Sequence, residues 1–306
     1  MISSLAGLFS IPVFSQNNIS LADAFIKAFS SESQKRFVFQ YHDPLRYEWR
    51  RTPGVRNGLA LYELNAEQKK ILHRMMSSVL TTAGYNKITH ILFNEDLSKE
   101  FDPETGQNKY WVAVYGKPAD TSAWGWRLEG HHLSIHFTFR GNKLVAATPF
   151  ELGSYPAVIE KDTVRAGFRN LANEIDLGFE LVQSLSVSQL SKAQVSKTRP
   201  REGMMGERNK ISVAKPVGIS YKELSVTQQT TVNKLIEEVM NSVSENFKID
   251  YSDIHFAWWG PLDGSGTYWY RLHSNVLLID FEDIGNHIHY VWRMLKNDFG
   301  SNPYTN

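Results

Sequence analysis

Apolar residues follow the period of a helix in some stretches of the chain and the period of a strand in others. Helical spacing predicts helices over residues 21–28, 65–82, 85–93, 163–182 and 225–247. Alternating spacing predicts strands over residues 110–115, 124–128, 131–139, 144–147, 252–258, 267–272, 275–282 and 286–293. This order of helices and strand blocks favours an α+β fold over an alternating α/β fold. We expect an antiparallel or mixed sheet built from both strand blocks and flanked by helices.

One helix-start signal recurs along the chain. An apolar residue precedes an Asn or Ser cap, and a Gln that can reach back follows three positions later, at Asn65, Ser186 and Ser225. Because such caps are common and their spacings here are irregular, they do not predict an internal repeat. A turn at 140–142 predicts an antiparallel hairpin between the strands that flank it.

The sequence predicts a single α+β domain over residues 17–306 that includes a long loop at 196–218. This loop lacks periodicity and could divide two domains, but the candidate site described below needs both strand blocks. Residues 1–16 are apolar and end near the small Ser15, a pattern typical of a secretory signal peptide and of an exported or periplasmic protein. The missing basic start leaves a buried strand and a cytoplasmic location as the alternative. After residue 16, no run of apolar residues is long enough to span a membrane as a helix.

Charge and composition limit the classes of binding partner and of chemistry that the chain can support. The 33 Lys and Arg balance 32 Asp and Glu, which argues against nucleic acid and leaves a small-molecule ligand as the expected partner. With no cysteine, the chain has no disulfide, no thiolate metal ligand and no cysteine nucleophile. No nucleophile elbow, phosphate-binding loop or H-E-x-x-H helix occurs.

Candidate chemistry gathers in two histidine-bearing segments, GHHLSIH and NHIH. In the first, strand alternation places His132, Ser134 and His136 on one face and His131 on the other. At the rise of a strand, His132 and His136 stand about 13 Å apart, too far to bind one ion. Any metal site therefore needs ligands from elsewhere in the chain.

The second segment supplies such ligands. His287 and His289 share a strand face about 6.6 Å apart in backbone, so two imidazoles can converge on one ion. Asp280 and Glu282 share a face of the preceding strand, and a turn would bring them near the histidines. The sequence therefore predicts imidazoles and carboxylates on adjacent strands.

Two classes of function compete on this pattern. The first is a metal-dependent enzyme, hydrolytic rather than oxidative, with Glu129 or Asp280 as ligand or general base. Zinc suits mixed imidazole and carboxylate ligation, but iron or copper would fit as well, and those metals would turn the chemistry toward oxygen. The four candidate ligands are His131, His132, His287 and His289.

The second class is a metal-free binding module for an anionic or sugar-like ligand, in which arginines and aromatic rings form the cleft. Its candidate residues are Trp126, Arg127, Tyr270, Arg271 and Arg293. A third interpretation gives the histidines only a structural role in buried polar networks. We assign that role to the histidines with no partner nearby in sequence: His42, His73, His90 and His255.

Several motifs resemble one known family, the domain of unknown function family numbered 3500. They are Trp124–Ser134 (WGWRLEGHHLS), Thr148–Gly153 (TPFELG) and His287–Arg293 (HIHYVWR), with Asn297–Gly300 (NDFG) near the end. The likeness covers about residues 37–300. The resemblance implies that GHH and HIH belong to one site, but it implies no reaction.

Two departures from the family pattern affect the expected site. The resemblance implies an amide at the position of His136, so we expect His136 to lie outside the ligand set. It also implies a tail ending in a His-Tyr pair, whereas the final residues here are Ser301–Asn306. If that tail contributes to the site in relatives, the site of this chain is altered.

Overall fold

The computed structural model describes residues 17–99, 103–160, 164–200, 215–250 and 252–301. Its helices are α1 (Asn18–Lys27), α2 (Ser31–Gln34), α3 (Ala66–Val79), α4 (Thr82–Ser98), α5 (Ala172–Gln183), α6 (Val187–Ala193) and α7 (Val226–Met240). Short 3-10 helices are η1 (Pro44–Tyr47), η2 (Leu61–Glu63), η3 (Tyr221–Glu223) and η4 (Asp298–Gly300). In these ranges, no helix is both long enough and apolar enough to cross a membrane.

The strands fall into two blocks. The first holds β1 (Val38–Phe39), β2 (Leu59–Ala60), β3 (Tyr110–Tyr115), β4 (Ala123–Gly130), β5 (Leu133–Arg140), β6 (Lys143–Ala146) and β7 (Phe150–Ser154). The second holds β8 (Gln194–Ser196), β9 (Ile219–Ser220), β10 (His255–Trp259), β11 (Tyr268–His273), β12 (Leu277–Asp283) and β13 (Ile288–Met294).

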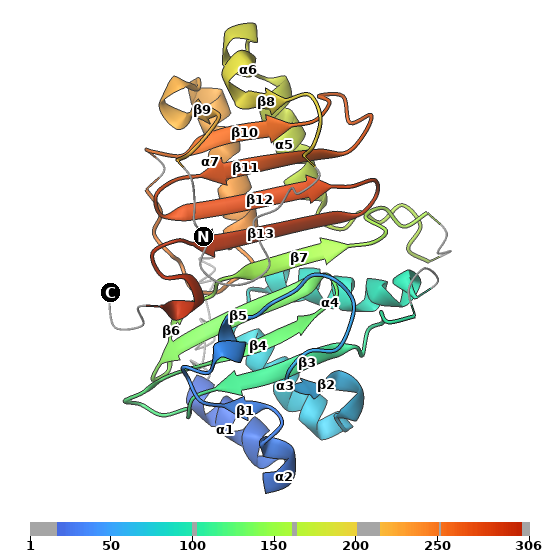
Figure 1. Ribbon diagram of the computed structural model, residues 1–306, viewed down its shortest axis with the longest axis vertical. Coiled ribbons are helices and arrows are strands. Elements are labelled where there is room, and N and C mark those ends of the chain that lie inside the picture. The colour runs from blue at the N-terminus through green and yellow to red at the C-terminus, as the bar shows by residue number, and fades with distance from the viewer. Residues whose placement is uncertain (1–16, 100–102, 161–163, 201–214, 251, 302–306) are drawn as a thin grey trace, which may run out of the picture.

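Both blocks join in one sheet, in the order β1-β3-β4-β5-β7-β13-β12-β11-β10-β8. Only β1 with β3 and β8 with β10 pair in parallel, and the other neighbours are antiparallel. Helices α1, α3, α4, α5 and α7 lie behind the sheet in Figure 1. The α+β prediction is therefore confirmed, with a mostly antiparallel sheet.

The two faces of the sheet are both buried but differ in character. The face toward the helices is apolar and includes Leu128, Ile135 and Leu152 in the main hydrophobic core. The opposite face, which we call the polar face, carries buried charged side chains such as Arg127 and Glu151. Strand alternation produces this division, because successive side chains point to opposite sides.

The segment between β1 and β2 covers part of the polar face. It passes in front of β4 and β5 in Figure 1. Arg127 of β4 fastens it by donating hydrogen bonds to the backbone oxygens of Leu45, Glu48 and Asn57, at 3.0, 2.6 and 3.0 Å. Arg127 can stay buried on this face because its guanidinium has these hydrogen-bond partners.

The sheet has an internal two-fold arrangement. Read from one edge its strands are β1, β3, β4, β5 and β7, and from the other edge β8, β10, β11, β12 and β13. The antiparallel pair β7 and β13 lies at the centre, where Phe150 pairs with Trp292. We call residues 18–154 the first unit and residues 172–294 the second unit.

Strand register supports this equivalence. Arg127 pairs with His136 across β4 and β5, and Arg271 pairs with Asp280 across β11 and β12. The neighbouring pairs match in turn, because the motifs R-L-x-x-x-x-L-x-I in the two hairpins have identical spacing. The two hairpins are therefore counterparts residue by residue.

The segments that lead into β2 and β9, and from there into α3 and α7, also have the same local structure in the two units. Gly58 and Gly218 stand just before β2 and β9 and adopt φ of 133° and 98°. A Cβ on either would lie 2.5 or 2.0 Å from a backbone oxygen of the adjoining strand, so only glycine fits both places. Asn65 and Ser225 then cap α3 and α7 with reciprocal Gln partners. The sequence did not predict this internal repeat, because α4 and β6, which have no counterpart among the described residues of the second unit, make the spacings along the chain irregular.

Several predicted boundaries also differ. Residues 131–132 form a turn instead of the start of a strand, and β7 was not predicted. Helix α5 begins at Ala172, and α7 ends at Met240. Only Ser196 of the predicted loop belongs to β8, while residues 201–214 of that loop and the predicted signal peptide lie outside the described residues.

Candidate functional site

The GHH segment forms the tight turn between β4 and β5. Gly130 pairs with Leu133, so His131 and His132 are the two turn residues, and His132 has a positive φ of 59°. Two-residue hairpin turns need positive φ, which a non-glycine residue rarely adopts. This turn frees both imidazoles from strand alternation, so the predicted placement of His131 and His132 on opposite faces was wrong.

Glu95 of α4 accepts a hydrogen bond from each of these two imidazoles. Nδ1 of His131 donates to Oε2 of Glu95 at 3.0 Å, and Nδ1 of His132 donates to Oε1. Glu95 is 2% exposed. Because a carboxylate only accepts hydrogen bonds, each ring is protonated on Nδ1.

Sequence reasoning missed Glu95, although a signal was present. Ile88, Ile91, Glu95 and Ser98 fall at helical spacing and are all buried. A carboxylate inside the apolar stripe of an amphipathic helix needs a buried partner. The sequence did not identify the histidines as that partner.

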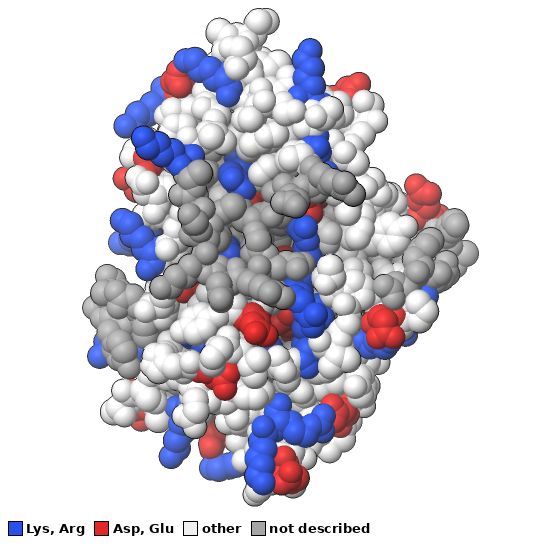
Figure 2. Space-filling model, viewed as in Figure 1, with Lys and Arg blue, Asp and Glu red and all other residues white. Residues whose placement is uncertain are grey.

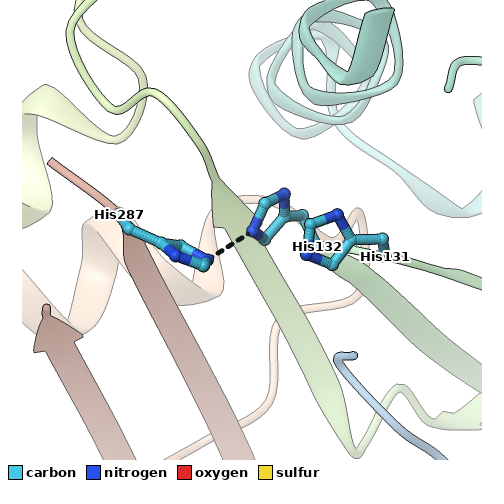
Figure 3. Close-up of side chains that lie close together, drawn as sticks. All are labelled: His131, His132 and His287. Carbon is cyan, nitrogen blue, oxygen red and sulfur yellow. Dashed lines mark hydrogen bonds between the residues drawn. The ribbon is translucent and has the colours of Figure 1, made fainter. Parts of the chain in front are cut away.

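His287 completes a three-histidine cluster. Its Nε2 lies 2.7 Å from Nε2 of His132, although the two residues come from opposite halves of the chain (Figure 3). One ligand atom from each of His131, His132 and His287 lies within 4.8 Å of the others. The two histidine motifs therefore meet at one point, at the ends of β5 and β13.

His289 borders this cluster from the polar face. Its ring centroid lies 4.7 Å from that of His287 and 5.2 Å from that of His132. Gly153 of β7 makes room for it, since a Cβ there would stand 2.6 Å from Cδ2 of His289 and 2.9 Å from Cδ2 of His132. The backbone oxygen of Ile288 would be only 2.8 Å away, so a side chain at this position cannot be accommodated without a shift.

A carboxylate and two arginines continue the site. Oε1 of Glu282 lies 3.5 Å from Nδ1 of His289 and 2.8 Å from Nη1 of Arg51. Oε2 of Glu282 lies 3.2 Å from Nη1 of Arg199. Arg51 and Arg199 were not among the predicted site residues, because both stand in loops whose course only the structure shows.

Burial and charge set the protonation states. Burial lowers the pKa of His132, and Glu95 offsets this only in part. Burial, together with His132 and His131, lowers the pKa of His287 to about 3. The pKa of His289 also falls well below its ordinary value, chiefly through burial. These three imidazoles are therefore neutral at pH 7.

The pKa values of Glu95 and Glu282 are shifted in opposite directions. Burial alone would raise the pKa of Glu95, but the hydrogen bonds from His131 and His132 outweigh it and hold the pKa below its ordinary value. Burial raises the pKa of Glu282, with Arg51 acting against this effect. Glu95 is therefore ionised at neutral pH.

The two predicted catalytic carboxylates are engaged by arginines. Oε1 of Glu129 lies 2.8 Å from Nε of Arg56, and Oε2 lies 2.9 Å from Nε of Arg127. Asp280 accepts two hydrogen bonds from Arg271, at 2.6 and 2.9 Å. Both pairs stabilise the polar face, and neither carboxylate contacts the three clustered histidines.

The remaining predicted ligand-binding residues lie apart from the cluster. Trp126 and Tyr270 are buried in the core on the helix side of the sheet. Arg293 binds Asp298, with Nε and Oδ2 2.9 Å apart. His136 is buried on the polar face, where its Nε2 lies 3.2 Å from Oγ of Ser134.

A family model described as "Protein of unknown function (DUF3500)" matches residues 14–301. The chain belongs to this family. The match extends across both units, so the DUF3500 family shares the region that brings the GHH and HIH motifs together. No curated protein and no solved structure matches the chain.

Proposed function

We propose that this DUF3500 protein binds a divalent transition metal through His131, His132 and His287 and uses it in a hydrolytic reaction. The observation that carries the proposal is the double hydrogen bond to Glu95, which fixes the Nδ1–H tautomer of two adjacent histidines. A carboxylate that orients metal-binding imidazoles in this way is a recurrent feature of metalloenzymes.

The donor set fits zinc. Three imidazoles with one position left open are typical of catalytic zinc sites, while structural zinc sites use four protein ligands. A zinc ion in such a site lowers the pKa of a water ligand toward neutrality, which is the chemistry that hydrolysis requires. The same donors accept iron or copper, and with those metals the reaction would involve oxygen.

His289 and Glu282 would assist on the polar face. His289 is the fourth histidine of the proposed site, and its Nδ1 edge faces Glu282 at 3.5 Å. Of the strand carboxylates Glu129, Asp280 and Glu282, it is Glu282 that approaches a histidine of the site. We therefore assign the role of proton acceptor to Glu282 in place of Glu129 and Asp280. His289 would pass a proton between the cluster and this carboxylate.

A metal-free binding module is the second candidate. Its support is the direct contact of 2.7 Å between Nε2 of His132 and Nε2 of His287, which gives these buried nitrogens a partner without any ion. In that case Glu95 would serve a buried polar network, and the site would bind its ligand through hydrogen bonds.

Metal content separates the two candidates. Protein without a histidine tag should contain close to one equivalent of metal by elemental analysis, or recover it on soaking. His132→Ala and His287→Ala should each lose most of it, because each removes a ligand. His136→Ala is the matched control, since it removes a buried histidine outside the cluster. Metal below about a tenth of an equivalent that soaking does not restore would favour the binding module.

The reaction class needs its own measurement. Zinc-loaded protein should hydrolyse esters or amides from a substrate panel, and His287→Ala should abolish this activity. Circular dichroism must show that the variant stays folded, because a buried histidine can also matter for stability. Oxygen consumption by an iron-loaded or copper-loaded sample, with no hydrolysis by the zinc form, would contradict the hydrolytic assignment.

A further inference from the structure

Two arginines from different units meet on one carboxylate beside the proposed metal site. Arg51 follows β1 and Arg199 follows β8, and these two strands occupy equivalent places at opposite edges of the sheet. Nη1 of Arg51 lies 2.8 Å from Oε1 of Glu282, and Nη1 of Arg199 lies 3.2 Å from Oε2. Residues from the two sheet edges thus reach the same point of the polar face.

This point adjoins the histidines. Glu282 and His289 are directly paired across β12 and β13. Oε1 of Glu282 approaches both Nη1 of Arg51 and Nδ1 of His289, so guanidinium and imidazole are neighbours across one oxygen atom. A group held by Arg51 would therefore lie next to the histidine cluster.

The arginine pair is accessible to solutes, while its carboxylate is not. The side chains of Arg51 and Arg199 are 26% and 18% exposed, and that of Glu282 is 2% exposed. Figure 2 shows Lys and Arg side chains at the surface in several parts of this face, some of them near its middle. Glu282 therefore holds the guanidiniums from beneath, and a solute would approach them from the solvent side.

Guanidinium groups are suited to planar oxyanions. Each carries N–H donors in a fixed fork that matches the geometry of carboxylate, phosphate or sulfate. A purely structural pair would need only to fasten two crossing segments. A buried carboxylate that fixes two arginines beside several imidazoles is instead the arrangement expected of a pre-organised oxyanion subsite.

We infer that the substrate carries an oxyanion group and that Arg51 and Arg199 bind this group next to the histidine cluster. The inference rests on the proposed function, because it names the substrate class for that same site. It also explains how a substrate would be oriented, since two guanidiniums fix an oxyanion while the rest of the molecule extends toward the histidines.

The experiment measures oxyanion binding on metal-stripped protein, so that the anion cannot bind a metal. The probes are inorganic phosphate, sulfate and acetate, followed by calorimetry and by the shift of the melting temperature. Arg51→Gln and Arg199→Gln should each weaken phosphate binding about tenfold or more, because each removes charge-assisted hydrogen bonds. Arg74→Gln, an exposed arginine of α3, is the matched control and should bind like the parent.

Glu282→Gln gives an expected gain. The internal carboxylate competes with an added oxyanion for the two guanidiniums, so its neutral isostere should bind phosphate more tightly than the parent. This variant keeps the test decisive even if an arginine variant loses stability, because a gain of affinity cannot come from misfolding.

The outcomes separate this inference from the proposed function. Unchanged phosphate binding in both arginine variants, or binding that disappears when the metal is removed, would overturn the inference even if the metal content is as proposed. Absence of metal in the parent protein would instead overturn the proposed function. Weaker binding in both arginine variants, with tighter binding in Glu282→Gln, would support the subsite.

Discussion

The β4–β5 hairpin of the first unit and the β11–β12 hairpin of the second are counterparts that differ in their turns. Both have the same spacing and register, with Arg127 opposite His136 in one and Arg271 opposite Asp280 in the other. The first turn carries His131 and His132, whereas Asn275 and Val276 occupy the second turn. Only the first turn approaches a buried carboxylate on a helix.

The source of that difference is α4. This helix stands between α3 and β3 in the first unit, whereas the described residues between α7 and β10 form no helix. Without α4 there is no Glu95, and two adjacent imidazoles at a turn would have no group to orient them. The repeated sheet therefore places both turns, while α4 supplies the carboxylate that orients the two imidazoles of the first turn.

The largest expected effect concerns histidines that share the polar face but differ in distance from the cluster. His289→Ala should sharply lower metal content, because its ring packs against those of the proposed ligands His287 and His132 and holds them in place. His136→Ala should leave metal content near that of the parent. Elemental analysis of folded samples measures both, and equal metal in His289→Ala and the parent would show that His289 does not hold the ligands in place.

Removing the carboxylate that only the first unit has should give the next largest effect. Glu95→Gln keeps the size and shape of the side chain. The neutral amide has only one oxygen, so it can no longer accept hydrogen bonds from both imidazoles as the carboxylate does. We expect a loss of about 10–100-fold in metal affinity, the usual cost of changing a group that orients ligands. Competition with a chelator measures it. An unchanged affinity would show that Glu95 does not orient metal ligands.

A smaller effect should follow from filling the space beside the histidines. Gly153→Ala places a Cβ 2.8 Å from the backbone oxygen of Ile288, so the strands must shift. We expect the free energy of unfolding of metal-free protein to fall by about 1–3 kcal/mol, as for other overpacked sites.

Gly266→Ala is the control for this substitution, because its nearest neighbour, Cγ of Pro261, is 3.6 Å away. Its free energy of unfolding should change by less than about 1 kcal/mol. Urea denaturation measures both variants, and an equal response would mean that the space at Gly153 is not constrained.

The smallest effect tests the equivalence of the two units themselves. Asn65 and Ser225 accept from the backbone N–H of Gln68 and Gln228 at 2.9 and 3.3 Å, in matching caps of α3 and α7. Asn65→Ala and Ser225→Ala should each lower the free energy of unfolding by about 1 kcal/mol. Unequal losses in urea denaturation would show that the counterpart helices contribute differently to stability.

Prediction from sequence succeeded where a local pattern decides the outcome. Alternating apolar residues revealed both strand blocks, and the capping signal at Asn65, Ser186 and Ser225 was observed at all three helices. The motifs also identified the family, and the match to residues 14–301 confirms it. These features depend on residues within a few positions of one another, which is the range that sequence patterns report.

Prediction from sequence failed where contacts between residues far apart in the chain determine the structure. Short β7 was missed because its pattern is weak, yet it joins the two units and contributes Gly153. Trp126 and Tyr270 were assigned to ligand binding, but strand alternation and the helix layer place them in the core. The repeat was hidden because insertions change the spacing along the chain without changing strand register.

Local patterns along the chain were enough to predict the α+β class and the alternation of apolar and polar strand faces, and to locate the two histidine motifs. Only the tertiary structure decided that His132 and His287 touch, that Glu95 orients two imidazoles, and that Arg51 and Arg199 share Glu282. The physical reason is that strand and helix periodicity act locally, whereas these contacts depend on which strands become neighbours. That choice is made when both units bury their apolar faces in one sheet.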